Sequence, residues 1–260
     1  MLANPSAFDL FRHSVFSHLD WVIFDADNTL WDLENLYHSA RSKLIRFLVN
    51  LEFDADEVDQ FQRNRDMELF KKYGRKPIRF PESFIDTLIH FKPAPSKEEV
   101  EYVWEIAHSV FSRLAEPYPG VADALRLLSK HARIAILTAG SKEIQERRLR
   151  QFPYMQFINT WEVVEQKNPN TFREFLDAQR IEAYHSWMIG DSIRSDIIPA
   201  RAVGLNTVFV ESDNWSAIEN HGLNPQEIAD YSVKSVREAV NLILQGLATV
   251  GRHKRKNNNV

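Results

Sequence analysis

Residues 21–30 read WVIFDADNTL, and this stretch decides the fold class. Its first four residues are aromatic, aliphatic or β-branched, which is typical of a buried parallel strand. The strand would end in two carboxylates, Asp25 and Asp27. Open α/β sheets bind ligands just beyond the carboxyl ends of their strands, so these acids are placed where chemistry would occur. The alternative interpretation is an acidic turn that caps a helix, because Asp, Asn and Thr are common capping residues.

The next part of the chain predicts helices and no strand. Apolar residues recur at helical spacing over residues 33–53, 56–73, 81–91 and 96–114. Ser96 and Glu99 form a capping-box pattern, which marks the start of the fourth helix. We therefore expect an all-helical domain over residues 31–117.

Helix and strand alternate after residue 118. The expected elements are a helix 121–130, a strand 134–137, helices 142–151 and 171–179, a strand 187–189, a helix 197–202, a strand 207–210 and a helix 233–245. This alternation predicts a parallel sheet that is covered on both faces. The fold class is therefore α/β, a doubly wound, Rossmann-like core domain of residues 1–30 and 118–250. The helical insert would be a lid over the carboxyl end of the first strand.

Composition narrows the possible partners. The chain has 260 residues, of which 44% are hydrophobic and 26% charged, and its formal net charge is −4. These values are ordinary for a soluble globular protein and give no bias toward nucleic acid. The sequence has no cysteine, which excludes disulfides and thiol catalysis. No apolar run is long enough to span a membrane, so we expect no membrane partner and a cytoplasmic location.

The two ends of the chain carry weaker signals. Phe8, Phe11, Val15 and Phe16 form an apolar stripe, which predicts either a further core helix or a dimer contact. A monomer and a homodimer therefore both stay open. Residues 251–260 read GRHKRKNNNV and are expected to be a disordered basic tail.

Further polar groups follow the later strands. Thr138 and Ala139 end one strand, where a hydroxyl and backbone N–H groups can bind an anion. Lys167 precedes a helix, and Asp191 follows a third strand, with Asp196 five residues later. The strand-borne groups would lie at the carboxyl edge of the sheet together with Asp25.

These features, in this order, resemble the four motifs of the haloacid dehalogenase superfamily. The matching segments are FDADNT, ILTAG, EQKNP and GDSIRSD, within a resemblance that covers about residues 20 to 245. The resemblance implies that the helical insert is the family's cap, placed directly after the first motif. It also implies Mg²⁺ as the cofactor.

The resemblance assigns a role to each motif residue. Asp25 would be the nucleophile, and Asp27 would be the general acid and base. The phosphoryl group would be bound by Thr138, Ala139 and Lys167. The metal site would consist of Asp25, the backbone carbonyl of Asp27, Asp191 and Asp196, with Asp196 as a further ligand or a support. The chemistry needs such groups, because a carboxylate attacks a phosphate only where positive charge offsets their repulsion. Mg²⁺ prefers the oxygen ligands that these acids offer.

The second acid narrows the reaction. Dehalogenases of the superfamily displace a halide, which needs no proton, and they lack an acid at this position. Asp27 therefore favours hydrolysis of a phosphate ester, with a small phosphorylated metabolite such as a nucleoside monophosphate or a sugar phosphate as substrate. A phosphomutase, which returns the phosphoryl group to a sugar, is one alternative. A non-catalytic phosphate-binding regulator is another.

The motifs depart from the family pattern at two positions. Ala139 stands where many phosphatase relatives have Asn, which removes a side-chain contact but keeps the backbone donor. Asn168 separates Lys167 from Pro169, which shifts the lysine slightly.

The insert contains candidates for contact with the rest of the substrate. They are Arg41, Lys43, Lys71, Lys72, Tyr73, Arg75 and Arg79. The commoner reason for such residues is a solvated basic face.

Overall fold

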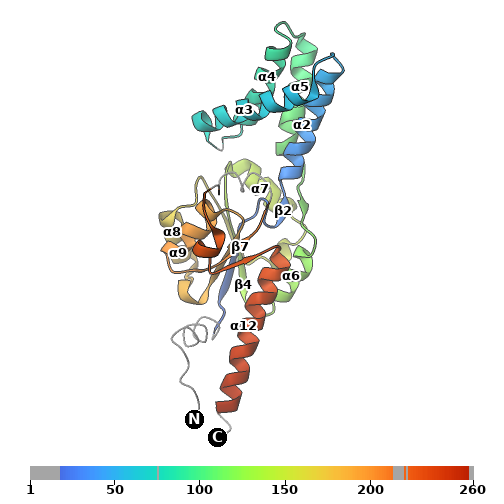
Figure 1. The fold of residues 1–260 in the computed structure, drawn as a ribbon. Helices are drawn as coiled ribbons and strands as arrows, with labels where there is room; N and C mark the ends of the chain where they lie inside the picture. Colours follow the sequence, from blue (N-terminus) through green and yellow to red (C-terminus); the bar gives the residue numbers. More distant parts are fainter. Residues whose placement is uncertain (1–17, 75, 213–219, 221, 258–260) are drawn as a thin grey trace. The chain divides into compact units, whose positions relative to one another are not determined.

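The structure, a computed structural model, describes residues 18–74, 76–212, 220 and 222–257, with only the backbone for 248–257 (Figure 1). The described residues form two compact units. One contains those of Met1–Asp32, Pro117–Ala139 and Leu149–Val260, and the other contains Leu33–Glu116 and Gly140–Arg148. The first is called here the sheet unit and the second the helical unit.

The sheet unit contains six parallel strands. They are β1 (Trp21–Phe24), β4 (Arg133–Ala139), β5 (Thr160–Val164), β6 (Trp187–Gly190), β7 (Asn206–Val210) and β8 (Tyr231–Val233). Their order in the sheet is β5-β4-β1-β6-β7-β8, and every neighbouring pair is parallel. The strand β1, which Asp25 directly follows, therefore lies inside the sheet, where the direction of winding reverses. Ligands of open α/β sheets bind at such switch points.

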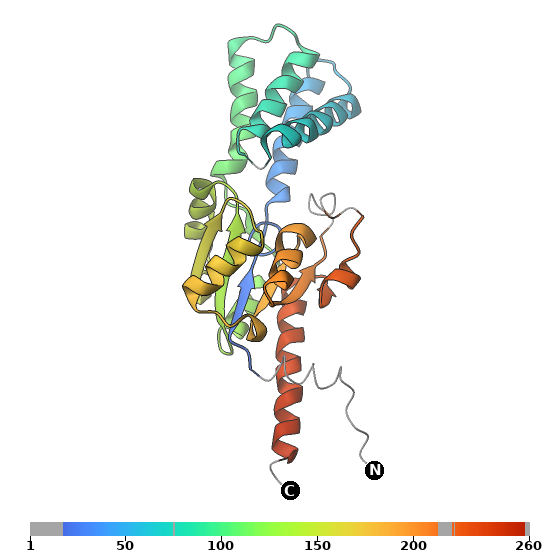
Figure 2. The ribbon, with the colours of Figure 1, turned by 90° about the vertical axis from the view of Figure 1, so that its left-hand side faces the viewer.

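Helices cover both faces of this sheet (Figure 2). On one face, α8 (Pro169–Gln179) and α9 (Ile198–Ala202) pack against alternate side chains of β1, β4 and β6 in one buried apolar cluster. The intervening side chains point to the other face, because a strand alternates with a period of two. There α6 (Val121–Leu128) packs against β4, and α12 (Val236–Asn257) packs against β7 and against α6. The predicted doubly wound α/β fold is confirmed.

Several boundaries differ from the prediction. The strands β5 and β8 were not predicted, and β8 occupies the expected start of the last helix. The helix α12 continues to Asn257, so the backbone of 251–257 is helical where a disordered tail was expected. Arg and Lys, which make up four of these seven residues, favour helix, so a helix that packs on the sheet can continue through them. Residues 258–260 and the amino-terminal apolar stripe lie outside the described residues.

The helical unit has a core of its own. Its helices are α2 (Glu34–Val49), α3 (Ala55–Tyr73), α4 (Arg79–Phe91) and α5 (Lys97–Ser112). Their apolar faces form one buried cluster around Leu44, Phe84 and Val103. The predicted capping box at the start of α5 is confirmed, since Ser96 and Glu99 bond each other's backbone N–H.

The segment 140–148 groups with these helices, although the predicted core domain included it. It contains most of α7 (Lys142–Gln151). Arg147 and Arg148 donate to the carbonyl oxygens of Phe111 and Val110 near the end of α5, at 3.1 and 3.2 Å. Such carbonyls have no partner within their own helix, so the two arginines satisfy them.

Two short segments complete the description. The strand β2 (Trp31–Asp32) pairs with β3 (Glu116–Pro117) in a two-stranded sheet. Both lie within residues 31–117, where only helices were predicted, because a strand of two residues is too short to give a recognisable sequence pattern. Among the residues that the structure describes, none of the helices is long and apolar enough to cross a bilayer.

Candidate active site

The strand register brings the predicted polar groups to one level of the sheet. Phe24, the last residue of β1, pairs with Ile136 of β4 and with Ile189 of β6. Thr138 and Asp191 each lie two residues beyond these partners. They therefore reach the same edge of the sheet on either side of the residues that follow β1.

Lys167 is the centre of the charged cluster at this edge. Its ammonium group donates hydrogen bonds to Asp25 and, at 2.6 Å, to Oδ1 of Asp196. The side chains of all three residues are less than 10% exposed. Buried charges of this kind are stable only when they are paired.

Burial and pairing shift the ionisation of these groups. Burial raises the pKa of Asp25 to about 7, against the opposing effect of Lys167. The negative charges of Asp196 and Asp27 add to this rise. Burial lowers the pKa of Lys167, but the carboxylates of Asp196 and Asp25 more than offset it and hold that pKa above its usual value. Lys167 is therefore charged at neutral pH, while Asp25 ionises only near neutrality without further positive charge.

Three acids form a group that could hold a metal ion. One carboxylate oxygen from each of Asp25, Asp191 and Asp196 lies within 4.8 Å of the other two, and all three residues are buried. Lys167 supplies one positive charge against three carboxylates, so a divalent cation would reduce the remaining negative charge. The donors are all oxygen, which suits Mg²⁺ and does not suit a metal that prefers nitrogen or sulfur. The residues therefore fit Mg²⁺. The carboxylate of Asp27 is not in this group.

Asp191 is held by contacts from three segments. Thr29 donates to Oδ1 at 3.4 Å, and Ser212 donates to Oδ2 at 3.5 Å. The side chain of Asn220 donates to the carbonyl oxygen of Asp191 at 3.1 Å and accepts from the backbone N–H of Ile193 at 2.8 Å. Asn220 therefore fixes the turn that carries the acid. No pattern around residue 220 indicated this role, because the contact joins positions 29 residues apart.

Asp196 lies on a short π-helix, Ile193–Ile197, where a helix starting at residue 197 was expected. Its Oδ2 accepts from the backbone N–H of Ser192 at 3.0 Å, so its two oxygens bind Ser192 and Lys167. A Cβ atom at Gly190 would lie 2.4 Å from Oδ2 of Asp196. Only glycine therefore allows this acid to fold back over the end of β6.

Asp27 has a different partner. Its Oδ1 accepts a hydrogen bond of 2.7 Å from the indole Nε1 of Trp31. Sequence reasoning missed this partner, although a tryptophan four residues after an acid in a turn was a usable signal. Asn28, between the two, has a φ of 60°, a left-handed conformation that Asn tolerates well.

The hydroxyl group of Thr138 is available to donate a hydrogen bond to an anion. Its side chain is 1% exposed, and its hydroxyl has no hydrogen-bond partner among the described residues. A buried hydroxyl without a partner costs about 1–3 kcal/mol, which a ligand oxygen would recover. Ala139 is the last residue of β4, directly after it.

Asn168 departs from the family pattern by separating Lys167 from Pro169, and the structure explains its presence. It is the N-cap of α8, and its side chain accepts from the backbone N–H groups of Asn170 and Thr171. The helix therefore starts at Pro169 rather than at Thr171 as expected. The extra residue does not displace Lys167, which still contacts Asp25.

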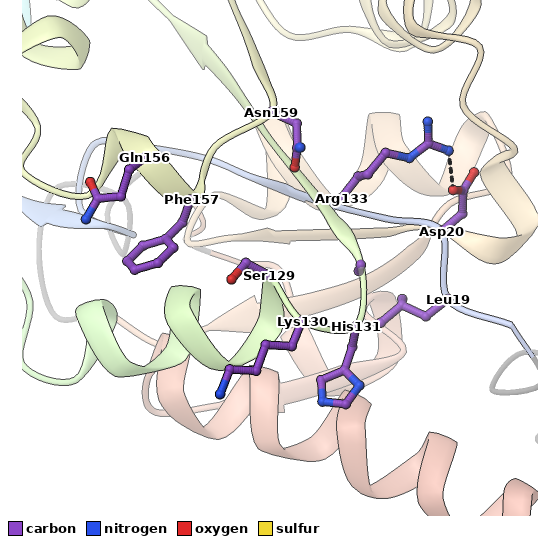
Figure 3. A pocket seen from close by; sticks show the side chains of 10 residues that line it. Leu19, Asp20, Ser129, Lys130, His131, Arg133, Gln156, Phe157 and Asn159 are labelled. Carbon is purple, nitrogen blue, oxygen red and sulfur yellow. Dashed lines mark hydrogen bonds and ion pairs between the residues drawn. The ribbon is translucent and has the colours of Figure 1, made fainter.

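A groove of about 510 Å³ lies at the opposite end of the strands (Figure 3). It is lined by residues that precede β1, β4 and β5, among them Lys130, His131 and Asn159. Arg133 in the groove is paired with Asp20, and the Lys130 and His131 side chains point away from Asn159 (Figure 3). The groove has no converging acids and is not the candidate active site.

The basic residues proposed for the insert have mixed positions in the helical unit. Arg41 is buried and donates to Gln62 at 2.8 Å, and Arg79 pairs with Asp66 at 2.5 Å. Lys43, Lys71 and Lys72 are exposed and Tyr73 is half-buried, whereas Arg75 lies outside the described residues. Arg41 and Arg79 therefore serve an internal polar network.

The sequence is similar to a known enzyme family and to named phosphatases. The family model described as haloacid dehalogenase-like hydrolase matches residues 22–210. Glyceraldehyde 3-phosphate phosphatase of Pyrococcus abyssi is 30% identical over 196 residues, covering 72% of this chain and 79% of that protein. The same enzyme of Pyrococcus furiosus is 26% identical over 236 residues, covering 85% and 92%.

A solved structure shares the fold over most of both chains. The haloacid dehalogenase-like family hydrolase from Xanthomonas campestris superposes with a TM-score of 0.73 at 23% identity, covering 91% of this chain and 99% of that one. The family match spans every motif from Asp25 to Asp196. The chain therefore belongs to the haloacid dehalogenase-like hydrolases, a family of enzymes that includes its phosphatase relatives.

Proposed function

We propose that the protein is a Mg²⁺-dependent phosphatase that hydrolyses a small phosphorylated metabolite through a phosphoaspartyl intermediate on Asp25. The observation that carries this proposal is the buried contact of Lys167 with Asp25, beside the further acids Asp191 and Asp196. A structural ion pair would need one acid for one lysine. The excess of acids instead favours a site completed by a cation and an anionic substrate.

The first chemical step forms a bond between Asp25 and phosphorus. A carboxylate oxygen of Asp25 attacks the phosphoryl group, and the bond between phosphorus and the ester oxygen breaks. Asp27 gives its proton to the leaving oxygen. Lys167 and the hydroxyl of Thr138 would bind the phosphoryl oxygens as charge develops on them. Mg²⁺, when bound, would supply positive charge that lowers the repulsion between Asp25 and the phosphate.

The second step restores the enzyme. Asp27, now ionised, takes a proton from a water molecule whose oxygen attacks the phosphorus. The bond between phosphorus and Asp25 breaks, which releases phosphate and returns Asp25 to a carboxylate. General acid and base catalysis of this kind contributes about 10²–10⁴ in rate.

The helical unit would be the cap that recognises the rest of the substrate. It is inserted directly after the segment that carries both catalytic acids, and it has its own core. Caps of this kind enclose small substrates and exclude water. The relatives named glyceraldehyde 3-phosphate phosphatase make that compound the first candidate, followed by other sugar phosphates and nucleoside monophosphates.

The test is phosphate release from such a panel, with Mg²⁺ and with a chelator. We expect release that requires Mg²⁺ and falls at least 10³-fold in Asp25→Asn, since removal of a catalytic nucleophile can cost about 10⁶-fold in kcat. Asp20→Asn makes the same substitution at the other end of β1 and should keep full activity. Unchanged release in Asp25→Asn would disprove the mechanism. Transfer of the phosphoryl group to a second position of the substrate, without free phosphate, would identify a phosphomutase instead.

A further inference from the structure

The strongest unexplained feature of the site is the hydrogen bond between Trp31 and Asp27. The indole Nε1 lies 2.7 Å from Oδ1 of Asp27, a short distance for a donor nitrogen and typical of a charged acceptor. Neither motif spacing nor the proposed steps require a tryptophan at this position. The contact therefore needs its own explanation.

Trp31 is held rigidly in the sheet unit. It is 2% exposed, and its ring packs on Phe152 with centroids 5.1 Å apart. The turn between acid and indole is closed by backbone hydrogen bonds, from Asn28 to Trp31 at 2.8 Å and from Leu30 to Ala26 at 2.8 Å. A donor fixed in this way restricts the rotation of the carboxylate that it binds.

The donor also distinguishes the two oxygens of the acid. An indole N–H donates and cannot accept, so Oδ1 serves as the acceptor oxygen. When Asp27 carries a proton, this contact favours the proton on Oδ2. The oxygen that exchanges a proton with the substrate would then be defined before the substrate binds.

We infer that Trp31 is a positioning residue that orients Asp27 for proton transfer to the leaving oxygen. The inference rests on the proposed phosphatase function. It adds a group that does not touch the substrate and acts only through Asp27. Its effect should therefore appear only in steps for which Asp27 must give or take a proton.

The leaving group provides the test. An alkyl phosphate needs a proton on its leaving oxygen, whereas p-nitrophenyl phosphate has a leaving group that departs without one. We expect Trp31→Phe, which keeps an aromatic ring but removes the N–H, to lower kcat/KM for an alkyl phosphate about tenfold, a part of the roughly 10²–10⁴ that acid–base catalysis contributes. The value for p-nitrophenyl phosphate should stay within about twofold, since that step does not use the acid.

Trp21→Phe is the matched control. Trp21 is also buried, but its indole N–H has no hydrogen-bond partner among the described residues. Its substitution should leave both substrates unaffected. Equal losses for both substrates in Trp31→Phe would show a purely structural role and overturn the inference. No loss for either would overturn it as well.

A second arm uses Asp27→Asn. If Trp31 acts through the acid, Trp31→Phe should cause no further loss with the alkyl phosphate in the Asp27→Asn background. A full further loss would contradict the inference even if the single variant were less stable. A parent protein that hydrolyses neither ester would instead overturn the proposed function, and this inference with it.

Discussion

The charged side chains at the site are buried in an arrangement that does not favour the stability of the fold. Lys167 is shared between Asp25 and Asp196, and both acids are buried. The net effect on Asp25 is a pKa raised to about 7, because burial outweighs the lysine. A residue that stabilised the fold by its charge would have a lowered pKa instead. The proposed nucleophile Asp25 is therefore held in the site at a cost to folding.

This cost predicts a stability change that depends on pH. The folded protein holds the proton of Asp25 up to about pH 7, whereas the unfolded chain loses it near 3.8, the ordinary pKa of an aspartate. Stability should therefore fall as pH rises from about 4 to 7 and stay low above that range. Asp25→Asn cannot ionise, so it should be more stable than the parent at pH 8, and the difference should shrink toward pH 5.

Thermal unfolding in a chelator measures the effect. Each kcal/mol corresponds to roughly 2–4 °C in Tm for a chain of this size. Asp20→Asn, which lies outside the buried cluster, should not reproduce this dependence on pH. If Asp25→Asn were less stable than the parent at pH 8, the pairing with Lys167 would outweigh the burial.

At the scale of elements, the interior of the sheet was predictable and its edges were not. The interior strands β1, β4, β6 and β7 are apolar runs that end in polar residues, and all four were predicted. The two strands of this sheet that were not predicted, β5 and β8, form its edges. Every residue in them is only half-buried, so no continuous apolar run indicates them.

The same reasoning applies to the site. The groups placed at strand ends, among them Asp25, Thr138 and Asp191, were predicted because a parallel sheet brings such ends together. Their supporting contacts were not, since a partner such as Asn220 comes from a connection whose path the sequence pattern does not define. Trp31 lies near its partner in sequence, but it is not one of the motif residues, so the sequence analysis assigned it no role.

The connection that carries Asn220 predicts an effect on metal binding. Asn220 fixes the backbone of Asp191 and Ile193 through its amide. Asn220→Ala should free this turn and weaken Mg²⁺ binding about 10–100-fold, as loss of an outer partner of a metal ligand typically does. Isothermal titration with Mg²⁺ measures this without any substrate.

Asn206→Ala is the control for this prediction. Asn206 is also buried and bonded to backbone carbonyls, those of Tyr184 and Ser186, but it lies at the start of β7. Its loss should lower stability and leave the affinity for Mg²⁺ unchanged. Equal affinities in all three proteins would show that Asn220 supports only the fold.

The whole molecule consists of two units with separate cores. All eleven buried apolar residues of the core of the helical unit come from α2, α3, α4 and α5. They are Ala40, Leu44, Leu48, Val58, Phe80, Phe84, Leu88, Val103, Ile106, Ala107 and Val110. None comes from the sheet unit, so the apolar core of the helical unit is complete without it.

This independence predicts that residues 33–116 fold as an isolated fragment. The fragment should show a helical circular dichroism spectrum and unfold cooperatively, because its core is complete without the sheet unit. Leu44→Ala should lower its stability by about 2–5 kcal/mol through the cavity it creates. Lys43→Ala changes the exposed neighbouring position and should have almost no effect.

Two other outcomes are informative. The fragment could lack cooperative unfolding but gain it when residues 140–148 are added as a peptide, which would show that Arg147 and Arg148 are required parts of the unit. A fragment that stays unfolded in both cases would show that the helices depend on the sheet unit, and that the two cores are not independent.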